Sequence, residues 1–547
     1  MLLELPKQDL MTVGEVVEEL RVSPATVRNW IKTGYLKSHN GKHISRNTFE
    51  DFCDEIIGAE KLIKRANKSK FDDHDHNKLK NSILARLSSA SPKQQEELGQ
   101  EYEESLSNAY KNKEGIYYTP PNIVARFFEF LPNDVANMKF CDPCCGTGNF
   151  IIAALDYGFL PENIYGYDID PIAVEIARAR FKSRTGLNGH NIINHDFLTT
   201  NQSNASDQRN TLYDVILTNP PWGKKLDPAT KKNLASFYKI SGSLDTASLF
   251  FYAAIKRSPI DGIVGMLLPD SFFNISTFTE TRKTALDLKI LGCVDFGKAF
   301  KGLLTKAKGI IVQNTEAEPA KNYVICDTWS GKHLRSQAEF IKNPKFILNF
   351  ACSEAESKVI NQIYSFPHVT LANNARWGLG IVTGNNNKFI VDSPQIGYVP
   401  VYKGSDISKG KLKNPANYIP NNMDLYQQVA SPEIYCANEK LVYRFISSKL
   451  VFYYDTNRAL FLNSANMLVL RDGFEIDVSK IAWLFNTEIM SWLFEKLFET
   501  HKVLRSDLEL LPIFSNFFND SNDLTEENLL SYLKISRTEN GTYRAEE

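Results

Sequence analysis

The side chains best suited to chemistry stand in two short segments that each lie at the end of a predicted strand. Residues 142–150 read DPCCGTGNF, and residues 213–222 read YDVILTNPPW. In the first segment, Gly146 and Gly148 let the backbone turn sharply and let a ligand approach it closely. In the second, paired prolines fix the backbone after Asn219. We therefore expect the first segment to bind a small molecule and the second to present hydrogen-bond acceptors to a substrate.

The first segment favours S-adenosylmethionine over a dinucleotide as the small molecule. Asp168 ends the next predicted strand, where a carboxylate can accept hydrogen bonds from ribose hydroxyl groups. The third glycine of the dinucleotide fingerprint is absent, and Asn149 and Phe150 replace the small residues that a pyrophosphate needs. A cofactor with an ammonium group and no phosphates suits Asp142 and Asp168 better. The alternative interpretation is a strand-to-helix turn with a structural role only.

The Asn-Pro-Pro-Trp corner of the second segment is suited to activating an amine. The Asn219 amide oxygen and the Pro220 carbonyl oxygen are two acceptors that the prolines hold at the carboxyl end of a strand. An exocyclic amine that donates to both keeps its lone pair available for attack on a methyl sulfonium, so no strong general base is needed. Pro221 helps to fix the corner, and Trp222 is expected to stack on the base that carries the amine.

Together, the glycine segment and the residues Asn219-Pro220-Pro221-Trp222 resemble the amino-methylating adenine-N6 DNA methyltransferases, in the motif order of their gamma class. The resemblance implies that a Tyr-Thr-Pro segment before the glycines helps to bind the methionine part of the cofactor. It also implies that a later Asp-Phe pair contacts the cofactor adenine. The cofactor-binding residues expected from the motifs are Tyr118, Thr119, Pro120, Asp142, Pro143, Cys145, Gly146, Gly148, Phe150, Asp168, Ile169, Asp196, Phe197 and Asn219.

Apolar runs bounded by Gly, Pro and Asp alternate with helical segments from residue 113 onwards. This pattern is typical of a parallel sheet covered by helices on both faces, and it predicts a doubly wound, Rossmann-like α/β catalytic domain over 113–344. Residues 345–547 predict an α+β domain that resembles the target-recognition domains fused to this class. Lysines crowd one of its loop regions, where they are expected to neutralise DNA phosphates, with solvated surface lysines as the alternative. These are Lys403, Lys409 and Lys411.

The first 54 residues predict two short helices joined by a tight turn, followed by a small wing. This part resembles the winged helix-turn-helix of the MerR-like regulators, which implies DNA contact through the second helix, while a packing or protein-contact module is the alternative. The outward-facing residues of that helix are Thr26, Arg28, Asn29 and Lys32. Residues 55–112 are polar and helix-favouring, and they predict a helical connector.

Composition narrows the class of protein but does not identify it. The 547 residues carry 63 basic and 64 acidic side chains, so any DNA contact must come from local clusters of charge. The 8 cysteines are sparse, which argues against a secreted disulfide framework. Cys141 and Cys144 have zinc-ligand spacing without a second pair nearby, so we expect no metal. No run of apolar residues is long enough to span a membrane, and the expected location is the cytoplasm.

The sequence therefore predicts site-specific methyl transfer from S-adenosylmethionine to N6 of an adenine that is flipped out of duplex DNA. The protein is expected to be the modification component of a restriction-modification system, with any nuclease activity supplied by a separate protein. No helicase-type phosphate loop and no nuclease carboxylate cluster is evident in the chain. Two alternatives stay open: methylation of a protein glutamine, and a DNA-binding regulator whose methyltransferase-like core does not turn over.

Overall fold

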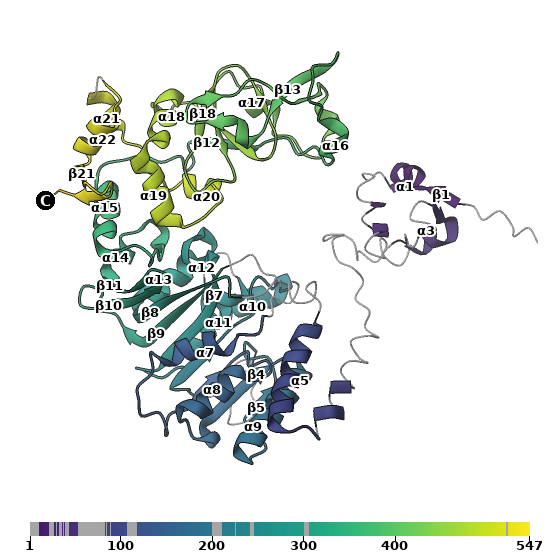
Figure 1. Ribbon diagram of the computed structural model, residues 1–547, viewed down its shortest axis with the longest axis vertical. Helices are drawn as coiled ribbons and strands as arrows, with labels where there is room; N and C mark the ends of the chain where they lie inside the picture. The colour runs from purple at the N-terminus through teal and green to yellow at the C-terminus, as the bar shows by residue number, and fades with distance from the viewer. Residues whose placement is uncertain are drawn as a thin grey trace, which may run out of the picture. The chain divides into compact units, whose positions relative to one another are not determined.

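The computed structural model describes residues 10–20, 27–28, 30–31, 36, 38, 43–52, 82–83, 85–87, 89–106, 117–199, 211–224, 226–240, 245–299, 306–520 and 523–546. The chain divides into two compact units, Met1–Lys113 and Glu114–Glu547, and Figure 1 shows the elements of each. No helix in these ranges is long and apolar enough to cross a membrane.

The first unit contains a small two-stranded sheet with helices. Strand β1 (Leu10–Thr12) pairs antiparallel with β2 (His43–Ser45), and each strand leads directly into a helix, α1 (Val13–Leu20) or α3 (Arg46–Phe52). The Thr12 hydroxyl caps α1 by accepting a hydrogen bond from the Glu15 amide at 3.3 Å. A longer helix, α5 (Pro92–Ser105), begins with a capping box at Ser91.

In the described part of the helix predicted to contact DNA, two apolar residues are buried. Val27 and Trp30 belong to a core that also contains Met11 and Ile44, and Arg28 is exposed, as predicted. Thr26, Asn29 and Lys32 lie outside the described residues. DNA contact by this helix stays a prediction.

The second unit is built on a nine-stranded sheet with the order β11-β10-β8-β9-β7-β6-β3-β4-β5. The chain runs from β3 outward to β5 and then returns to place β6 on the other side of β3, so the strand order reverses between β3 and β6. Open α/β sheets bind ligands at the carboxyl ends of the strands at such a point. The strands are β3 (Phe140–Asp142), β4 (Ile164–Asp168), β5 (Ile192–Asn194), β6 (Val215–Thr218), β7 (Ile263–Pro269), β8 (Leu288–Gly297), β9 (Ala307–Glu316), β10 (Tyr323–Thr328) and β11 (Gly331–Ser336).

Helices cover both faces of this sheet, as the doubly wound prediction requires. Along β6, Val215 and Leu217 belong to the apolar core on one face and Ile216 to the core on the other, which is the two-residue period of a fully buried strand. Helices α7, α8 and α9 contribute to the first core, and α11 and α13 to the second. The helices of this part are α7 (Pro121–Phe128), α8 (Asn149–Tyr157), η2 (Pro161–Asn163), α9 (Pro171–Thr185), α10 (Pro228–Tyr238), α11 (Thr246–Lys256), α12 (Ser271–Asn274), η4 (Ser276–Phe278), α13 (Thr279–Asp287), α14 (Gln337–Ile341) and η5 (Pro344–Phe346).

The sheet is mixed where the sequence predicts a parallel one. Strands β5, β4, β3, β6 and β7 run parallel to one another, but β9 runs antiparallel to both β7 and β8, and β11 runs antiparallel to β10. The connection from β8 to β9 is too short for a crossover helix, so these two strands can pair only in the antiparallel sense. The half of the sheet that carries the predicted site residues keeps the expected parallel arrangement.

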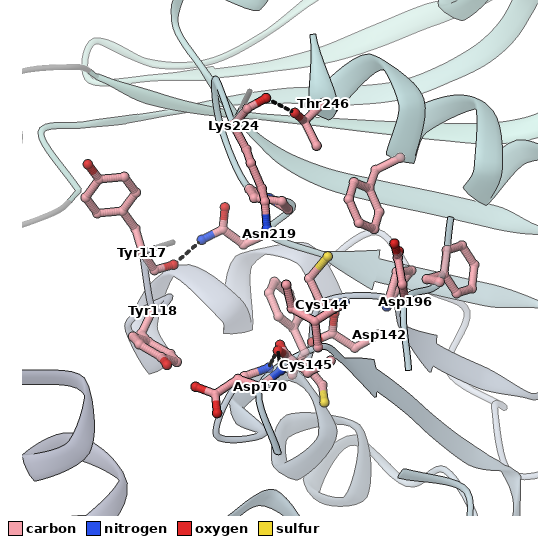
Figure 2. Close-up of a pocket in the computed structure, with 18 of the residues that line it drawn as sticks. Tyr117, Tyr118, Asp142, Cys144, Cys145, Asp170, Asp196, Asn219, Lys224 and Thr246 are labelled. Atoms are coloured by element: carbon pink, nitrogen blue, oxygen red, sulfur yellow. Dashed lines mark hydrogen bonds between the residues drawn. The ribbon is translucent and has the colours of Figure 1, made fainter. Parts of the chain in front are cut away.

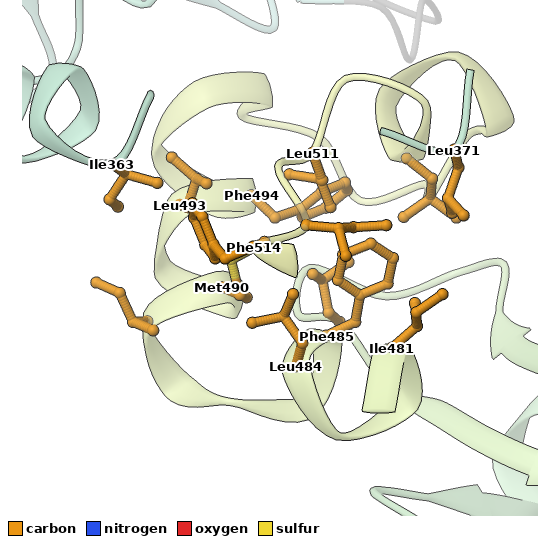
Figure 3. Packing of buried hydrophobic residues seen from close by; sticks show 14 of the residues in the cluster. Ile363, Leu371, Ile481, Leu484, Phe485, Met490, Leu493, Phe494, Leu511 and Phe514 are labelled. Atoms are coloured by element: carbon orange, nitrogen blue, oxygen red, sulfur yellow. The ribbon is translucent and has the colours of Figure 1, made fainter. Parts of the chain in front are cut away.

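The C-terminal part contains small sheets beside a cluster of helices. Helices α18 and α19 are separated at Thr487, whose hydroxyl caps α19 by accepting from the Met490 amide. Figure 3 shows part of the apolar core of this region. In it, residues of α18 and α19 pack together with Ile363 of α15 and with Leu511 and Phe514. The helices are α15 (Glu354–Ser365), α16 (Asn386–Phe389), η6 (Gly404–Asp406), η7 (Met423–Leu425), α17 (Pro432–Tyr435), α18 (Val478–Asn486), α19 (Glu488–Phe498), α20 (Arg505–Leu508), α21 (Ser515–Asp520) and α22 (Glu526–Tyr532).

The strands in the described residues of the C-terminal part form four sheets. The largest has the order β12-β20-β17-β18, and a second has the order β16-β13-β19. The strands are β12 (Ala375–Leu379), β13 (Tyr398–Tyr402), β14 (Ile407–Ser408), β15 (Lys411–Leu412), β16 (Tyr418–Pro420), β17 (Lys440–Arg444), β18 (Phe452–Asp455), β19 (Leu460–Phe461), β20 (Ala465–Leu470), β21 (Ile535–Arg537) and β22 (Tyr543–Ala545).

A fully buried ion pair joins β17 to β18. Lys440 Nζ lies 2.8 Å from Asp455 Oδ2, and neither side chain is exposed to solvent. The substitution Lys440→Met leaves the carboxylate buried without its counter-ion, and we expect it to lower the free energy of unfolding by about 3–5 kcal/mol. Calorimetry measures the change. Lys321→Met is the matched control, because the Lys321–Glu318 pair is 78 % and 71 % exposed and contributes at most about 1 kcal/mol. Equal unfolding temperatures for the two variants would contradict this expectation.

Candidate active site

A cavity opens at the carboxyl ends of β3, β4, β5 and β6, beside the reversal of strand order. The space within it, counted together with its open mouth, is about 960 Å³. Figure 2 shows side chains from the segment before α7, the turn after β3 and the loop after β6 converging on it. The predicted site residues that line it are Tyr118, Thr119, Asp142, Pro143, Cys145, Gly146, Phe150, Asp168, Ile169, Asp196, Phe197, Asn219 and Pro221.

The orientation of the Asn219 amide is set by a backbone carbonyl. Asn219 directly follows β6, and its Nδ2 donates a short hydrogen bond to the carbonyl oxygen of Tyr117, as Figure 2 shows. Because the amide nitrogen is committed to Tyr117, the amide oxygen is the acceptor that Asn219 offers to the cavity. This is the orientation that activation of an amine requires.

The two glycines of the turn after β3 have different roles. Gly146 (φ 50°) and Gly148 (φ 94°) both adopt the left-handed conformation, and the backbone turns sharply here. At Gly146 a Cβ atom would lie 2.8 Å from the ring of Tyr118, which lines the cavity. At Gly148 it would lie 3.1 Å from the Cβ atom of Ala177 on α9, and Gly148 does not line the cavity. Gly148 therefore allows two helices to pack closely.

A buried carboxyl group, of Asp142, and a half-buried one, of Asp168, lie beside this turn. Burial raises the pKa of Asp142 from 3.8 to about 7, although its carboxylate accepts a hydrogen bond from the Cys144 amide at 3.0 Å. Burial also raises the pKa of Asp168 to about 6, against hydrogen bonds from the amides of Asp170 and Gly146 at 2.9 and 2.8 Å. Near neutral pH both groups gain from a cationic ligand, because a positive charge favours their ionised form.

The Asp-Phe pair after β5 is fixed in the wall of the cavity. Asp196 Oδ1 accepts a hydrogen bond from the Leu198 amide at 2.9 Å. The Phe197 ring is 1 % exposed and packs edge-on against Tyr167, with ring centroids 5.2 Å apart. The ring is therefore held rigidly beside the cavity, where it can contact a flat ligand.

Asn149 and Arg180 connect the segment before α7 to the glycine turn. Asn149 Nδ2 donates to the Thr119 carbonyl oxygen at 2.9 Å, and its Oδ1 accepts from Arg180 Nη1 at 2.9 Å. The same Arg180 nitrogen donates to the carbonyl oxygen of Thr147 at 2.7 Å. These bonds fix the Tyr-Thr-Pro segment against the turn, although the two are far apart in the sequence.

Four predicted site residues do not line the cavity. They are Pro120, Gly148, Pro220 and Trp222. The Trp222 ring is 8 % exposed, its Nε1 donates to the Leu267 carbonyl oxygen at 3.2 Å, and its centroid lies 5.9 Å from that of Tyr117. Stacking of Trp222 on a substrate base stays a prediction, and it requires one face of the ring to become accessible.

Comparison with known proteins identifies the family of the chain. A family model described as the Eco57I restriction-modification methylase matches residues 162–301, and a TaqI-like C-terminal specificity domain matches residues 399–513. A helix-turn-helix domain model matches residues 10–54. The type II methyltransferase M.VspI of Vibrio sp. (strain 343) is 49 % identical over 410 residues, which cover 75 % of this chain and 98 % of that protein. The chain belongs to the type II methyltransferases.

It is a type II DNA methyltransferase of restriction-modification type, as the sequence predicts, with a helix-turn-helix at the N-terminus and a TaqI-like specificity domain towards the C-terminus. The modification methylase CviBIII of Paramecium bursaria Chlorella virus NC1A is 24 % identical over 237 residues, which cover 42 % of this chain and 57 % of that protein. Among solved structures, the type IIL restriction-modification enzyme MmeI in complex with DNA is 10 % identical with a TM-score of 0.51. The match covers 86 % of this chain and 73 % of that one, and it confirms the methyltransferase-like α/β fold.

Some residues that line the cavity of the methyltransferase do not stand in the motifs. Thr246 and Phe250 lie one turn apart on α11, and the Thr246 hydroxyl donates to the Lys224 carbonyl oxygen at 2.6 Å. Leu226, from the loop after the Asn-Pro-Pro-Trp corner, also lines the cavity. The four-residue spacing of Thr246 and Phe250 could have indicated one face of a helix lining a site. However, an apolar helix more often packs in the protein core, so the spacing did not identify these residues. The bonds of Asn149 and Arg180 could not be predicted from the sequence, because they form between segments that are distant in the chain.

The three loop lysines predicted to contact DNA have different surroundings in the specificity domain. Lys411 is exposed on β15, and Lys403 is half-buried. Lys409 Nζ lies 2.5 Å from Glu488 Oε1 at the start of α19, so part of its charge is already compensated. Contact of these lysines with DNA phosphates stays a prediction, and Lys411 is the most accessible of them.

The raised pKa of Asp142 predicts that the site reduces the stability of the ligand-free methyltransferase. Folding raises this pKa from 3.8 to about 7, so the folded state loses stability as the pH rises between these values. We expect Asp142→Asn, which keeps the acceptor for the Cys144 amide, to raise the free energy of unfolding at pH 8 by up to about 4 kcal/mol, at about 1.4 kcal/mol per pKa unit. The gain should shrink towards pH 5, as measured by denaturant unfolding.

The exposed carboxyl of Asp134 provides the control for this measurement. Asp134→Asn should leave the unfolding free energy nearly unchanged across the same pH range. A gain for Asp142→Asn that is independent of pH would contradict the prediction, because it would show that ionisation of Asp142 is not its cause.

Proposed function

We propose that this methyltransferase transfers the methyl group of S-adenosylmethionine to N6 of an adenine in duplex DNA. The observation that carries the proposal is the arrangement of Asn219, which lines the same cavity as the glycine turn and the carboxyl groups of Asp142 and Asp168, and whose amide nitrogen is bonded to Tyr117, so that the oxygen is left as its acceptor. The cavity wall contains four carboxylates, of Asp142, Asp168, Asp170 and Asp196, and one lysine, Lys224. This balance of charge suits a cationic cofactor without phosphates.

The residues present fit S-adenosylmethionine in three places. Asp168 would accept hydrogen bonds from the ribose hydroxyl groups, and Asp142 would stabilise the ammonium group of the methionine part. The rings of Phe197 and Phe250 and the side chain of Ile169 would bound the adenine. When bound, the cofactor supplies a methyl group on a sulfonium, which an amine can attack directly.

Asn219 and Pro220 would prepare the amine. The Asn219 amide oxygen and the Pro220 carbonyl oxygen would accept the two N6 hydrogens, which holds the lone pair of N6 towards the methyl group. The new N–C bond forms as the C–S bond breaks, the electron pair of that bond stays on sulfur, and N6 then releases one proton to water. No side chain has to act as a strong base.

The target adenine has to leave the duplex before it can reach Asn219. Unstacking costs roughly a few kcal/mol, and contacts of the specificity domain with the DNA would offset this cost. The specificity domain therefore supports duplex DNA as the substrate, in preference to a protein glutamine. Methylation would protect the recognised site from a separate restriction endonuclease in hosts that encode one.

A transfer assay tests the proposed function directly. The full chain is incubated with methyl-labelled S-adenosylmethionine and mixed-sequence duplex DNA, and the nucleosides are analysed by mass spectrometry. We expect the label on N6 of adenine, and sequencing of methylated host DNA then gives the recognition sequence. Label on cytosine, on RNA or on protein refutes the proposal. Cofactor binding without any transfer supports the regulator alternative.

Substitution of Asn219 tests the proposed activation of the amine. We expect Asn219→Ala to lower kcat at least ~100-fold, because it removes one of two acceptors that strengthen during the reaction. The dissociation constant for the cofactor, measured by calorimetry, should change less than about 3-fold. Asn191→Ala is the matched control, since Asn191 is a partly exposed asparagine whose Nδ2 binds the Glu162 carbonyl away from the cavity. Equal losses of kcat and cofactor affinity would indicate misfolding instead.

A further inference from the structure

One short segment of the catalytic sheet is attached both to the Asn-Pro-Pro-Trp corner and to the specificity domain. It comprises the end of β7 and the residues up to Asn274. The Leu267 carbonyl on β7 accepts the hydrogen bond from Trp222 Nε1 at 3.2 Å. A few residues later, Asn274 Nδ2 donates to the carbonyl oxygen of Phe498, at the end of α19, at 2.7 Å.

A buried lysine strengthens this attachment. Lys308 on β9 lies opposite Leu268 of β7, and its side chain is 3 % exposed. Its Nζ lies 2.9 Å from Asp270 Oδ1 and 2.7 Å from Glu499 Oε2. The pKa of Lys308 is raised, because the carboxylates of Glu499 and Asp270 outweigh the opposing effect of burial. The lysine is therefore charged and joins β7 and β9 to the residue that follows α19.

The end of α19 is also bound within the C-terminal part, by one residue just before α15 and one in its first turn. The last carbonyls of a helix lack partners within the helix. Here the Lys496 carbonyl accepts from Cys352 Sγ at 3.1 Å, and Lys496 Nζ lies 2.6 Å from Glu356. Glu499 itself ends the helix in a left-handed conformation, with φ 50°. The helix end is thus fixed in position and direction.

We propose that Lys308, Glu499 and Asp270 set the distance between the DNA sequence that the specificity domain reads and the base that reaches Asn219. This inference rests on the proposed function. Helix α19 lies within the residues that match the specificity-domain model. The segment from Leu267 to Asn274 also bonds to Trp222, the last residue of the Asn-Pro-Pro-Trp corner. The Lys308 cluster is therefore a positioning device for base selection, and none of its members touches the reacting atoms.

The geometry distinguishes this role from a purely structural one. Lys308 does not line the cavity, so its loss should leave the cofactor site unchanged. A structural ion pair affects the unfolding temperature alone, whereas a positioning pair also affects which DNA sites are methylated. The decisive quantity is the ratio of kcat/KM for the recognised site to that for a site with one changed base pair.

The experiment uses the full chain with the variants Glu499→Gln, Lys308→Met and Lys308→Arg. The recognised sequence is first obtained from methylated host DNA of the wild type, so failure of the proposed function appears before any variant is tested. We expect Glu499→Gln and Lys308→Met to lower the site-selection ratio about tenfold or more, with cofactor affinity within about 3-fold of wild type. Lys308→Arg keeps the positive charge and should recover most of the ratio.

Lys321→Met, which removes an exposed ion pair in the same unit, is the control and should leave the ratio unchanged. Glu499→Gln is the milder variant, because Lys308 keeps Asp270 as a partner, and it decides the result if Lys308→Met does not fold. A wild-type ratio in a folded Glu499→Gln variant, with or without a lower unfolding temperature, overturns the proposal.

Discussion

The hydrogen bond from the Asn219 amide to the Tyr117 carbonyl is the interaction on which the site depends. It joins the loop after β6 to the segment before α7, and it decides which end of the amide faces the cavity. A rotated amide would present a donor where an amine also needs to donate, and the two groups would repel. The segment that holds Tyr117 is itself bound to the glycine turn through Asn149 and Arg180. The cofactor wall and the amine acceptor are therefore positioned by one connected set of bonds.

The same site places Asp142 and Asp168 where burial disfavours their charge. The raised pKa values of both groups mean that the ligand-free protein carries an electrostatic cost near neutral pH. A bound cation removes part of that cost, so binding energy and folding energy are linked at these residues. A site optimised for stability would use neutral side chains here, and the presence of carboxylates favours the proposed cationic cofactor.

Much of this arrangement could be predicted from the sequence because it depends on local patterns. Strand ends followed by Asp142, Asp168 and Asn219 meet at one edge of a parallel sheet, so the residues that line the cavity were largely predictable. What could not be predicted depends on contacts between distant segments. The mixed pairing of β9, the burial of Trp222 and the role of Gly148 against α9 each follow from which element packs on which, and no local pattern contains that information.

Base flipping adds a mechanical requirement that the fold has to meet. The specificity domain can offset the cost of unstacking only if its contacts form while the extruded base is near Asn219. A loose connection would allow the domain to bind DNA in positions where the base cannot reach the cavity, and each such position would compete with the productive one. The bonds at the end of α19 restrict this freedom, because Phe498 and Glu499 are held by residues beside β7. Rigidity at this junction is therefore as relevant to site selection as the base contacts themselves.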